Sequence, residues 1–175
     1  MARFITDLAE IKGLSKEWRE LAMRFKTPLL QFEWFLAGAE TLYQPDQLRI
    51  FVHHSREGMR GVAPLVLTKK KGPERLEILG TGILDEPSGF IYENEASLRE
   101  LMSAILQMGK PLLFRRLRND SAKIKMLSQI SVGKYFLRNE TGSPFFDIQT
   151  TWDEFFAGMT SDNRNHLRRK QKLLE

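Results

Sequence analysis

The sequence contains no cysteine. This absence excludes a disulfide framework, a thiol nucleophile and every zinc or iron site that relies on thiolate ligands. Long apolar runs are also missing, and no segment approaches the ~20 apolar residues of a membrane-spanning helix. Residues 1–7 turn polar at once, which is not the pattern of a signal peptide. We therefore expect a cytoplasmic protein without a transmembrane segment.

The 175 residues are 42% hydrophobic and 28% charged, which is the composition of a globular domain. A chain of this length buries roughly 70% of its unfolded surface, so it needs no covalent or metal crosslink. Positive charge is unevenly placed: of 27 basic and 22 acidic residues, five basic and two acidic ones fall within 161–175. Much of the net charge of +5 therefore lies in a short C-terminal tail.

Three segments carry apolar residues at helical spacing, and they cover residues 15–25, 31–43 and 95–108. Gly109 and Pro111 follow the third segment as a helix stop. Asp7 and Glu10 have the spacing of a cap on a further helical turn. We expect the buried side chains of these helices to be Trp18, Phe25, Phe32, Phe35, Leu98, Met102 and Ile105.

Short runs rich in β-branched and aromatic residues predict the strands. Pro64, inside one of these runs, indicates a bulge or an edge strand. A short helix is expected at 120–129. The resulting element order predicts an α/β (α+β) fold, with one mixed sheet flanked by helices. The expected strands are 3–5, 47–54, 61–67, 75–79, 89–92 and 111–117, with a closing hairpin at 134–138 and 144–148.

Two further helices are expected after residue 150. Thr151 and Glu154 have the spacing of a capping box and open a short helix. Ser161 is expected to cap a last, basic helix that continues to Glu175. We therefore divide the chain into a domain at 1–150 and a helical extension at 151–175.

This element order resembles the GNAT superfamily of acyl-coenzyme-A transferases. The chain is more closely similar to the first half of the Fem-type enzymes, which carry two GNAT-like halves in tandem, and within them to the CelD-like (cellulose biosynthesis) branch. The resemblance rests on the order and spacing of several short motifs. They are Trp18-x-x-Leu21, Pro28 followed by Phe32-x-Trp34, Val62-Ala63-Pro64-Leu65, Ile78-Leu79-Gly80, Thr151-Trp152-Asp153-Glu154-Phe155 and Ser161-x-x-Arg164-x-x-Leu167-Arg168-Arg169.

The resemblance implies a GNAT-like domain whose missing second GNAT domain holds the acyl-coenzyme A and the transfer chemistry. The intact protein would move an acyl group from acetyl-coenzyme A or another acyl donor, or an aminoacyl group from a charged tRNA, to an amine or hydroxyl. The acceptor would be a small molecule or a cell-envelope precursor. This segment would support the second half and form one wall of the acceptor cleft. We expect it to be a truncated piece that is inactive alone.

The GNAT family holds the pyrophosphate of its cofactor on an Arg/Gln-x-x-Gly-x-Gly/Ala loop that opens a helix. The nearest match here, Glu77 to Gly82, begins with an acidic residue, and no helix is expected directly after it. Just before the helix at residue 95, where the loop belongs, stands Ile91-Tyr92-Glu93-Asn94, which has no glycine. We therefore expect this segment to bind no acyl-coenzyme A, and read Gly80 and Gly82 as a tight turn.

Other catalytic patterns are missing from the sequence. There is no Gly-x-Ser-x-Gly elbow. His53 and His54 are adjacent on an expected strand, so their side chains point to opposite faces and cannot share a metal without a bulge. We expect no metal site, and no residue stands out as a catalytic base.

Three side chains are our candidates for the acceptor cleft: Trp34, Arg164 and Arg168. Trp34 lies outside the core arc of its helix, where it either packs on another part of the chain or contacts the acceptor or the missing half. Arg164 and Arg168 form a basic stripe with Lys172 and are expected to face the cleft. A further basic group, Arg115, Arg116 and Arg118, either meets an anionic acceptor or is solvated.

The basic tail also leaves a second function open, a non-catalytic module that binds nucleic acid or a protein partner through its last helix. Aromatic residues are not interleaved with the basic ones at 161–175, which disfavours single-stranded nucleic acid. We therefore favour the acyltransferase half.

Overall fold

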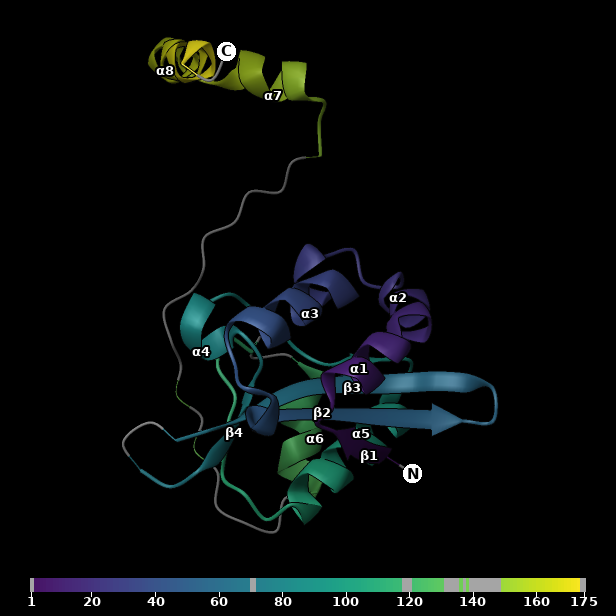
Figure 1. The fold of residues 1–175 in the computed structure, drawn as a ribbon. Helices are drawn as coiled ribbons and strands as arrows, with labels where there is room; N and C mark the ends of the chain where they lie inside the picture. Colours follow the sequence, from purple (N-terminus) through teal and green to yellow (C-terminus); the bar gives the residue numbers. More distant parts are fainter. Residues whose placement is uncertain are drawn as a thin grey trace. The chain divides into compact units, whose positions relative to one another are not determined.

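The computed structural model describes residues 2–69, 72–117, 121–130, 136, 138 and 149–173. The chain divides into two compact units, Met1–Leu137 and Arg138–Glu175, and each is described by itself. The first unit is a sheet with helices on both faces (Figure 1). The mixed α/β architecture expected from the sequence is therefore confirmed.

Six strands form the sheet within the described residues, in the order β1-β2-β3-β4-β6, with β5 beside β3. The neighbouring strands are antiparallel, except β4 and β6, which are parallel. Most of the expected strands are present, but the one expected at 111–117 is much shorter. The strands are β1 (Ala2–Ile5), β2 (Leu48–Ser55), β3 (Gly58–Thr68), β4 (Arg75–Ile78), β5 (Ile91–Tyr92) and β6 (Leu112–Leu113).

Pro64 lies inside β3 and pairs with β2 on one side, but on the other side β4 pairs only from Leu65 and β5 only at Gly61 and Val62. The proline therefore stands at a local edge, which is one of the two alternatives expected from the sequence. The carbonyl of Pro64 accepts a hydrogen bond from the N–H of Leu79 at 2.9 Å. Its nitrogen faces the same side, because both backbone groups of a residue in an antiparallel pair point toward one neighbour. β4 ends at Ile78 on that side. Pro64, which has no N–H, therefore lies just beyond the hydrogen-bond ladder between β3 and β4, where no strand needs that donor.

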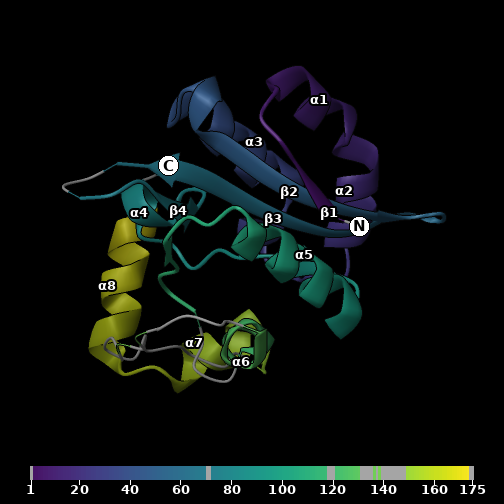
Figure 2. The ribbon, with the colours of Figure 1, turned by 90° about the horizontal axis from the view of Figure 1, so that it is seen from below.

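Helices α1 (Leu8–Gly13), α2 (Ser15–Ala22) and α3 (Phe32–Thr41) cover one face of the sheet (Figure 2). The backbone N–H of Glu10 donates to the Asp7 carboxylate, so the expected cap is confirmed. Trp18, which is fully buried, lies at the centre of this face and meets the ring of Phe32 edge-on at 5.5 Å between centroids. Two short 3₁₀ turns, Pro28–Leu30 and Pro45–Gln47, join α3 to its neighbours.

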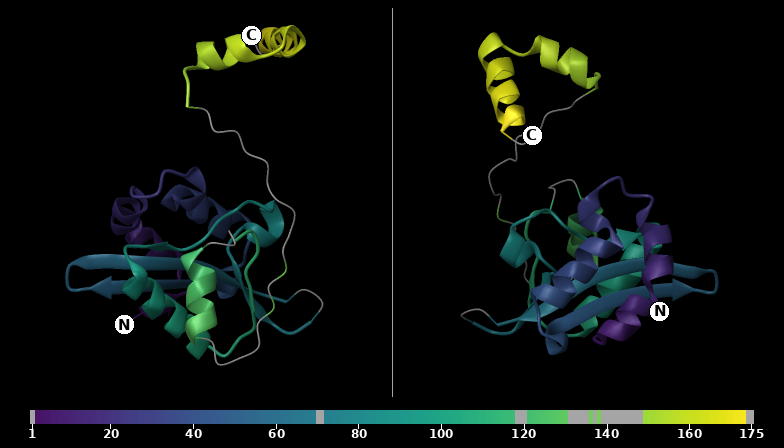
Figure 3. Two further views of the ribbon diagram at one scale, coloured as in Figure 1. Left: turned by 180° about the vertical axis from the view of Figure 1, so that it is seen from behind. Right: turned by 45° about the horizontal axis from the view of Figure 1, so that its top comes forward.

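The opposite face carries α5 (Glu95–Gln107) and α6 (Ala122–Ile130), drawn in teal and green in the left panel of Figure 3. Leu98, Met102 and Ile105 are completely buried here, as expected. Phe25 is the exception among the expected core residues. It lies at the margin of the core, only partly buried, with its ring 6.4 Å from that of Tyr92.

The second unit contains α7 (Trp152–Gly158) and α8 (Ser161–Lys172). The capping box of Thr151 and Glu154 is confirmed, with both reciprocal hydrogen bonds present. The cap of α8 is Thr160 rather than Ser161, because the Thr160 hydroxyl accepts from the N–H of Asn163. α8 ends at Lys172 and does not continue to the C-terminus as expected.

The expected hairpin at 134–138 and 144–148 lies outside the described residues, apart from Phe136 and Arg138. Throughout the described ranges, each helix is too short or too polar to cross a membrane.

Replacing Phe32 with alanine tests the aromatic core beneath α2 and α3. Phe32 is 2% exposed, so its truncation leaves a cavity and should reduce the free energy of unfolding by about 3–5 kcal/mol. Phe4, which is 46% exposed, is the matched control, and Phe4→Ala should cost at most about 1 kcal/mol. Urea denaturation followed by circular dichroism measures both values. Equal losses in the two variants would contradict this core assignment.

Candidate functional site

The N-terminus of α5 is the position where the resemblance places a phosphate-binding loop, and here it is capped by the chain itself. Asn94 precedes the helix in an extended conformation. Its side-chain oxygen accepts hydrogen bonds from the N–H of Ser97 at 2.9 Å and from the Ser97 hydroxyl at 3.1 Å. One of the free N–H groups with which a helix start binds anions is therefore already used.

Glu93 places a carboxylate directly before this cap. Arg24 donates to its Oε1 at 3.0 Å, and Arg60 donates to its Oε2 at 2.5 Å. The two guanidinium groups hold the pKa of Glu93 below the ordinary range of a glutamate. The chain thus supplies its own anion at the helix start, with two arginines already bound to it.

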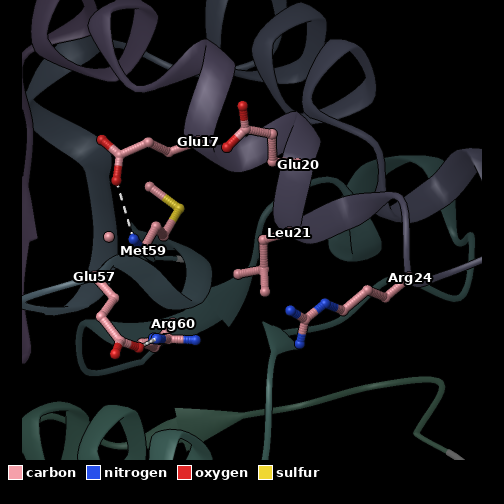
Figure 4. A pocket seen from close by; sticks show the side chains of 8 residues that line it. Glu17, Glu20, Leu21, Arg24, Glu57, Met59 and Arg60 are labelled. Carbon is pink, nitrogen blue, oxygen red and sulfur yellow. Dashed lines mark hydrogen bonds and ion pairs between the residues drawn. The ribbon is translucent and has the colours of Figure 1, made fainter.

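Arg24 and Arg60 also line a cavity of about 380 Å³ between α2 and the hairpin of β2 and β3 (Figure 4). Glu17 closes one side of it, with Oε2 accepting from the N–H of Met59 at 3.0 Å. Arg60 additionally forms an ion pair with Glu57. The complete lining is Glu17, Glu20, Leu21, Arg24, Glu57, Gly58, Met59 and Arg60.

The charge of this cavity is unbalanced. Three glutamates line it against two arginines, and both arginines are bound to carboxylates. Glu20 has no ion-pair or hydrogen-bond partner in the part of the chain that the structure describes. A positively charged group would therefore be attracted to this cavity, and a phosphate would be repelled.

The segment from Glu77 to Gly82, which is the nearest match to a phosphate loop, forms a tight turn at the end of β4. A one-turn helix, α4 (Thr81–Leu84), follows Gly80, so the expectation that no helix opens here is wrong. Gly80 has φ +86° and donates its N–H to the hydroxyl of Tyr43 at 3.1 Å. Its carbonyl accepts from Leu84 at 2.8 Å. The expected tight turn is present, with its polar groups satisfied internally.

Trp34 is partly buried and packs against the core between α3 and the sheet. Its indole nitrogen lies 3.9 Å from where a Cβ on Gly80 would stand, and a Cβ on Gly38 would come within 2.7 Å of Leu79. Because Gly38 and Gly80 carry no side chain, the segment that follows β4 can pack closely against α3 beside Trp34. Packing within the chain accounts for these contacts, while the acceptor role of Trp34 stays a prediction.

Arg164 and Arg168 belong to the second unit, where both contact α7. Arg164 donates to the carbonyl of Ala157 at 2.9 Å and also to that of Met159. The guanidinium of Arg168 lies over the ring of Phe156, 5.2 Å from its centroid. Lys172 is exposed at the end of α8. Trp34, the third candidate for the acceptor cleft, belongs to the first unit.

The two adjacent histidines and the basic group at 115–118 are the remaining candidates, and those that the structure describes contact nearby side chains or solvent. A bulge separates His53 from His54 in β2, and Nε2 of His54 lies 3.3 Å from Glu17. Across the ranges that the structure describes, no cluster of three or more metal-ligating side chains is present. Arg116 forms an ion pair with Asp85, and Arg115 is exposed. Arg118 lies outside the described residues.

The clamp around Glu93 could not be read from the sequence. Its arginines lie 69 and 33 residues away along the chain, and no periodicity connects them to the carboxylate. The only signal was the acidic residue itself, at a position where the family has glycine.

No family model matches the chain, and no curated protein is significantly similar to it. Solved structures do share its fold. One is an aminoglycoside N-acetyltransferase, AAC(6')-Iy, in complex with CoA: 12% identity, TM-score 0.52, 86% of this chain and 95% of the other covered. Another is a probable acetyltransferase: 10% identity, TM-score 0.52, 84% and 99% covered. The GNAT-like fold expected from the sequence is confirmed, and the Fem-type tandem arrangement stays a prediction.

The clamp predicts a stability that depends on pH. Because the pKa of Glu93 is lowered in the folded state, its ion pairs contribute above the ordinary glutamate pKa of about 4.3 and are lost as pH falls through the lowered value. Glu93→Gln should therefore lower the melting temperature at pH 7 by a few degrees, and the difference should shrink below pH 4. Calorimetry over this range measures it.

Glu95→Gln is the matched control, because Glu95 stands at the same helix start, is 71% exposed and lies 3.9 Å from Arg99. It should leave the melting temperature nearly unchanged at both pH values. A Glu93→Gln effect that does not vary with pH would show that the clamp is not electrostatic.

Proposed function

We propose that this chain is the supporting half of an acyltransferase, which forms one wall of an acceptor cleft and does not itself hold the acyl donor. The observation that carries the proposal is the Glu93 clamp at the start of α5. The acetyltransferase-type fold supports the reaction class. The clamp supports the division of labour, because it fills the anion site that such a fold would offer to a cofactor.

Acyl-coenzyme A does not fit the start of α5. A pyrophosphate there would meet the carboxylate of Glu93 and would have to displace it from Arg24 and Arg60. The cap formed by Asn94 would compete for the same N–H groups. We therefore assign the donor, whether acetyl-coenzyme A or an aminoacyl-tRNA, to a second GNAT domain of the intact protein.

The charged cavity beside the clamp is the surface that we assign to the acceptor. Its surplus of carboxylates favours an acceptor that carries an amine, since a protonated amine gains from Glu17 and Glu20. Within the described residues no histidine lines this cavity to serve as a general base. The role of this half is therefore to bind and orient the acceptor, and the proton transfer belongs to the second half.

The alternative function is a non-catalytic module that binds nucleic acid or a protein through α8. The contacts of α8 favour it less, because Arg164 and Arg168 are turned toward α7. The reading frame that follows residue 175 separates the two. A second β/α half with a Gln/Arg-x-x-Gly-x-Gly loop supports the acyltransferase, whereas a stop codon supports the module.

Calorimetric titration with acetyl-coenzyme A tests the assignment of the donor. The wild-type chain should show no micromolar binding, which would need about −8 kcal/mol. Glu93→Ala frees Arg24 and Arg60, so inorganic pyrophosphate should bind this variant at least five-fold more tightly than it binds the wild type. The control Glu95→Ala should not gain affinity. A wild-type dissociation constant near 1 μM for acetyl-coenzyme A would overturn the proposal.

A further inference from the structure

A second cavity, of about 260 Å³, opens on the face of the sheet that carries α3. It shares no lining residue with the charged cavity beside Glu93. Its lining includes Leu42, Tyr43, Thr68, Lys69, Glu77 and Ile83.

Glu77 is the unusual group in this lining. It lies on β4 and is only 2% exposed, although an ionised carboxylate is rarely buried so deeply. Oε1 accepts from the Thr68 hydroxyl at 2.8 Å and from Nε of Arg75 at 2.7 Å. Oε2 accepts no hydrogen bond from any described residue. The second oxygen of a buried carboxylate is thus left for whatever occupies the cavity.

Tyr43 supplies the complementary group. Its hydroxyl oxygen accepts from the N–H of Gly80 at 3.1 Å, so the hydroxyl proton remains available for a second partner. Burial, together with the charge of Glu77, raises the pKa of Tyr43 and keeps that proton in place. An acceptor and a donor therefore lie in one cavity, beside the apolar side chains of Leu42 and Ile83.

The surrounding charges decide the class of ligand. Arg75 is paired with Glu77, Arg115 acts on the same carboxylate from beyond β6, and Lys69 lines the cavity. A cationic ligand would be repelled by these three positive groups. An anionic group at Oε2 of Glu77 would place a second acceptor against it. Neither oxygen would have a proton to share, because, despite burial, the neighbouring Arg75 and Thr68 hold the pKa of Glu77 below its ordinary value. A neutral ligand that donates one hydrogen bond and accepts another escapes both penalties.

We propose that this cavity binds a neutral polyhydroxy compound the size of a single sugar ring. One hydroxyl donates to Oε2 of Glu77, a neighbouring hydroxyl accepts from Tyr43, and the C–H face of the ring covers Leu42 and Ile83. The volume agrees with this size, because pockets for larger, drug-sized ligands occupy about 300–1,000 Å³.

Three pyranoses that differ in charge provide the test: glucose, glucosamine and glucuronate, titrated separately against the ¹⁵N-labelled chain at pH 7. Glucose should shift the amide resonances of Gly80, Thr68 and Glu77 in a saturable way. Glucosamine and glucuronate should bind at least five-fold more weakly. No saturable shift with glucose, or equal affinity for all three sugars, would overturn the proposal.

Two tyrosine variants locate the site. Tyr43→Phe removes the donor and should weaken glucose binding at least five-fold, whereas Tyr92→Phe, on β5 and outside the cavity lining, should leave it unchanged. Glu77→Gln, where it folds, should weaken binding as Tyr43→Phe does. Glucose affinity in Tyr43→Phe equal to that of the wild type, with the spectrum of a folded chain, would contradict the assignment.

Discussion

Three elements that are far apart in the sequence meet at one carboxylate. Arg24 follows α2, Arg60 lies on β3, and Glu93 stands before α5, so the two ion pairs join both faces of the sheet. The carboxylate lies near the positive end of the α5 dipole, which adds to its stabilisation. Two arginines and the start of a helix together favour a negative charge at this junction. The chain supplies that charge with the side chain of Glu93, and no bound anion is needed.

Two short strands, β4 and β5, lie on the same side of β3 and pair with different parts of it. β3 pairs with β4 from Leu65 to Thr68 and with β5 at Gly61 and Val62. The chain between these two short strands leaves the sheet, forms the turn at Gly80 and packs on α3 through Leu79. The Glu77 cavity lies at the start of this excursion. The cavity therefore lies where the strand beside β3 is interrupted between β4 and β5.

Much of the fold could be predicted from local patterns. The apolar arc of α5 and the caps at Asp7 and Thr151 are properties of neighbouring residues, so the sequence contains them. The clamp of Glu93 and the open oxygen of Glu77 depend on partners brought together only by the sheet. α4 cannot be predicted from the sequence, because four residues carry no helical period and Gly80 is the only local signal of a turn before it. Phe25 lies beyond the last turn of α2, so the helical period does not predict its burial.

The break between β4 and β5 leaves a stretch of β3, around Ala63 and Pro64, with a strand on only one side over part of its length. An open strand edge of this kind is a template for the addition of a strand from another molecule. Pro64 removes the N–H that such a strand would need at the middle of the gap. If the turn at Gly80 opens, the exposed edge of β3 still lacks a continuous row of hydrogen-bond donors. Pro64 therefore disfavours the addition of a strand from another molecule, which is a step in aggregation.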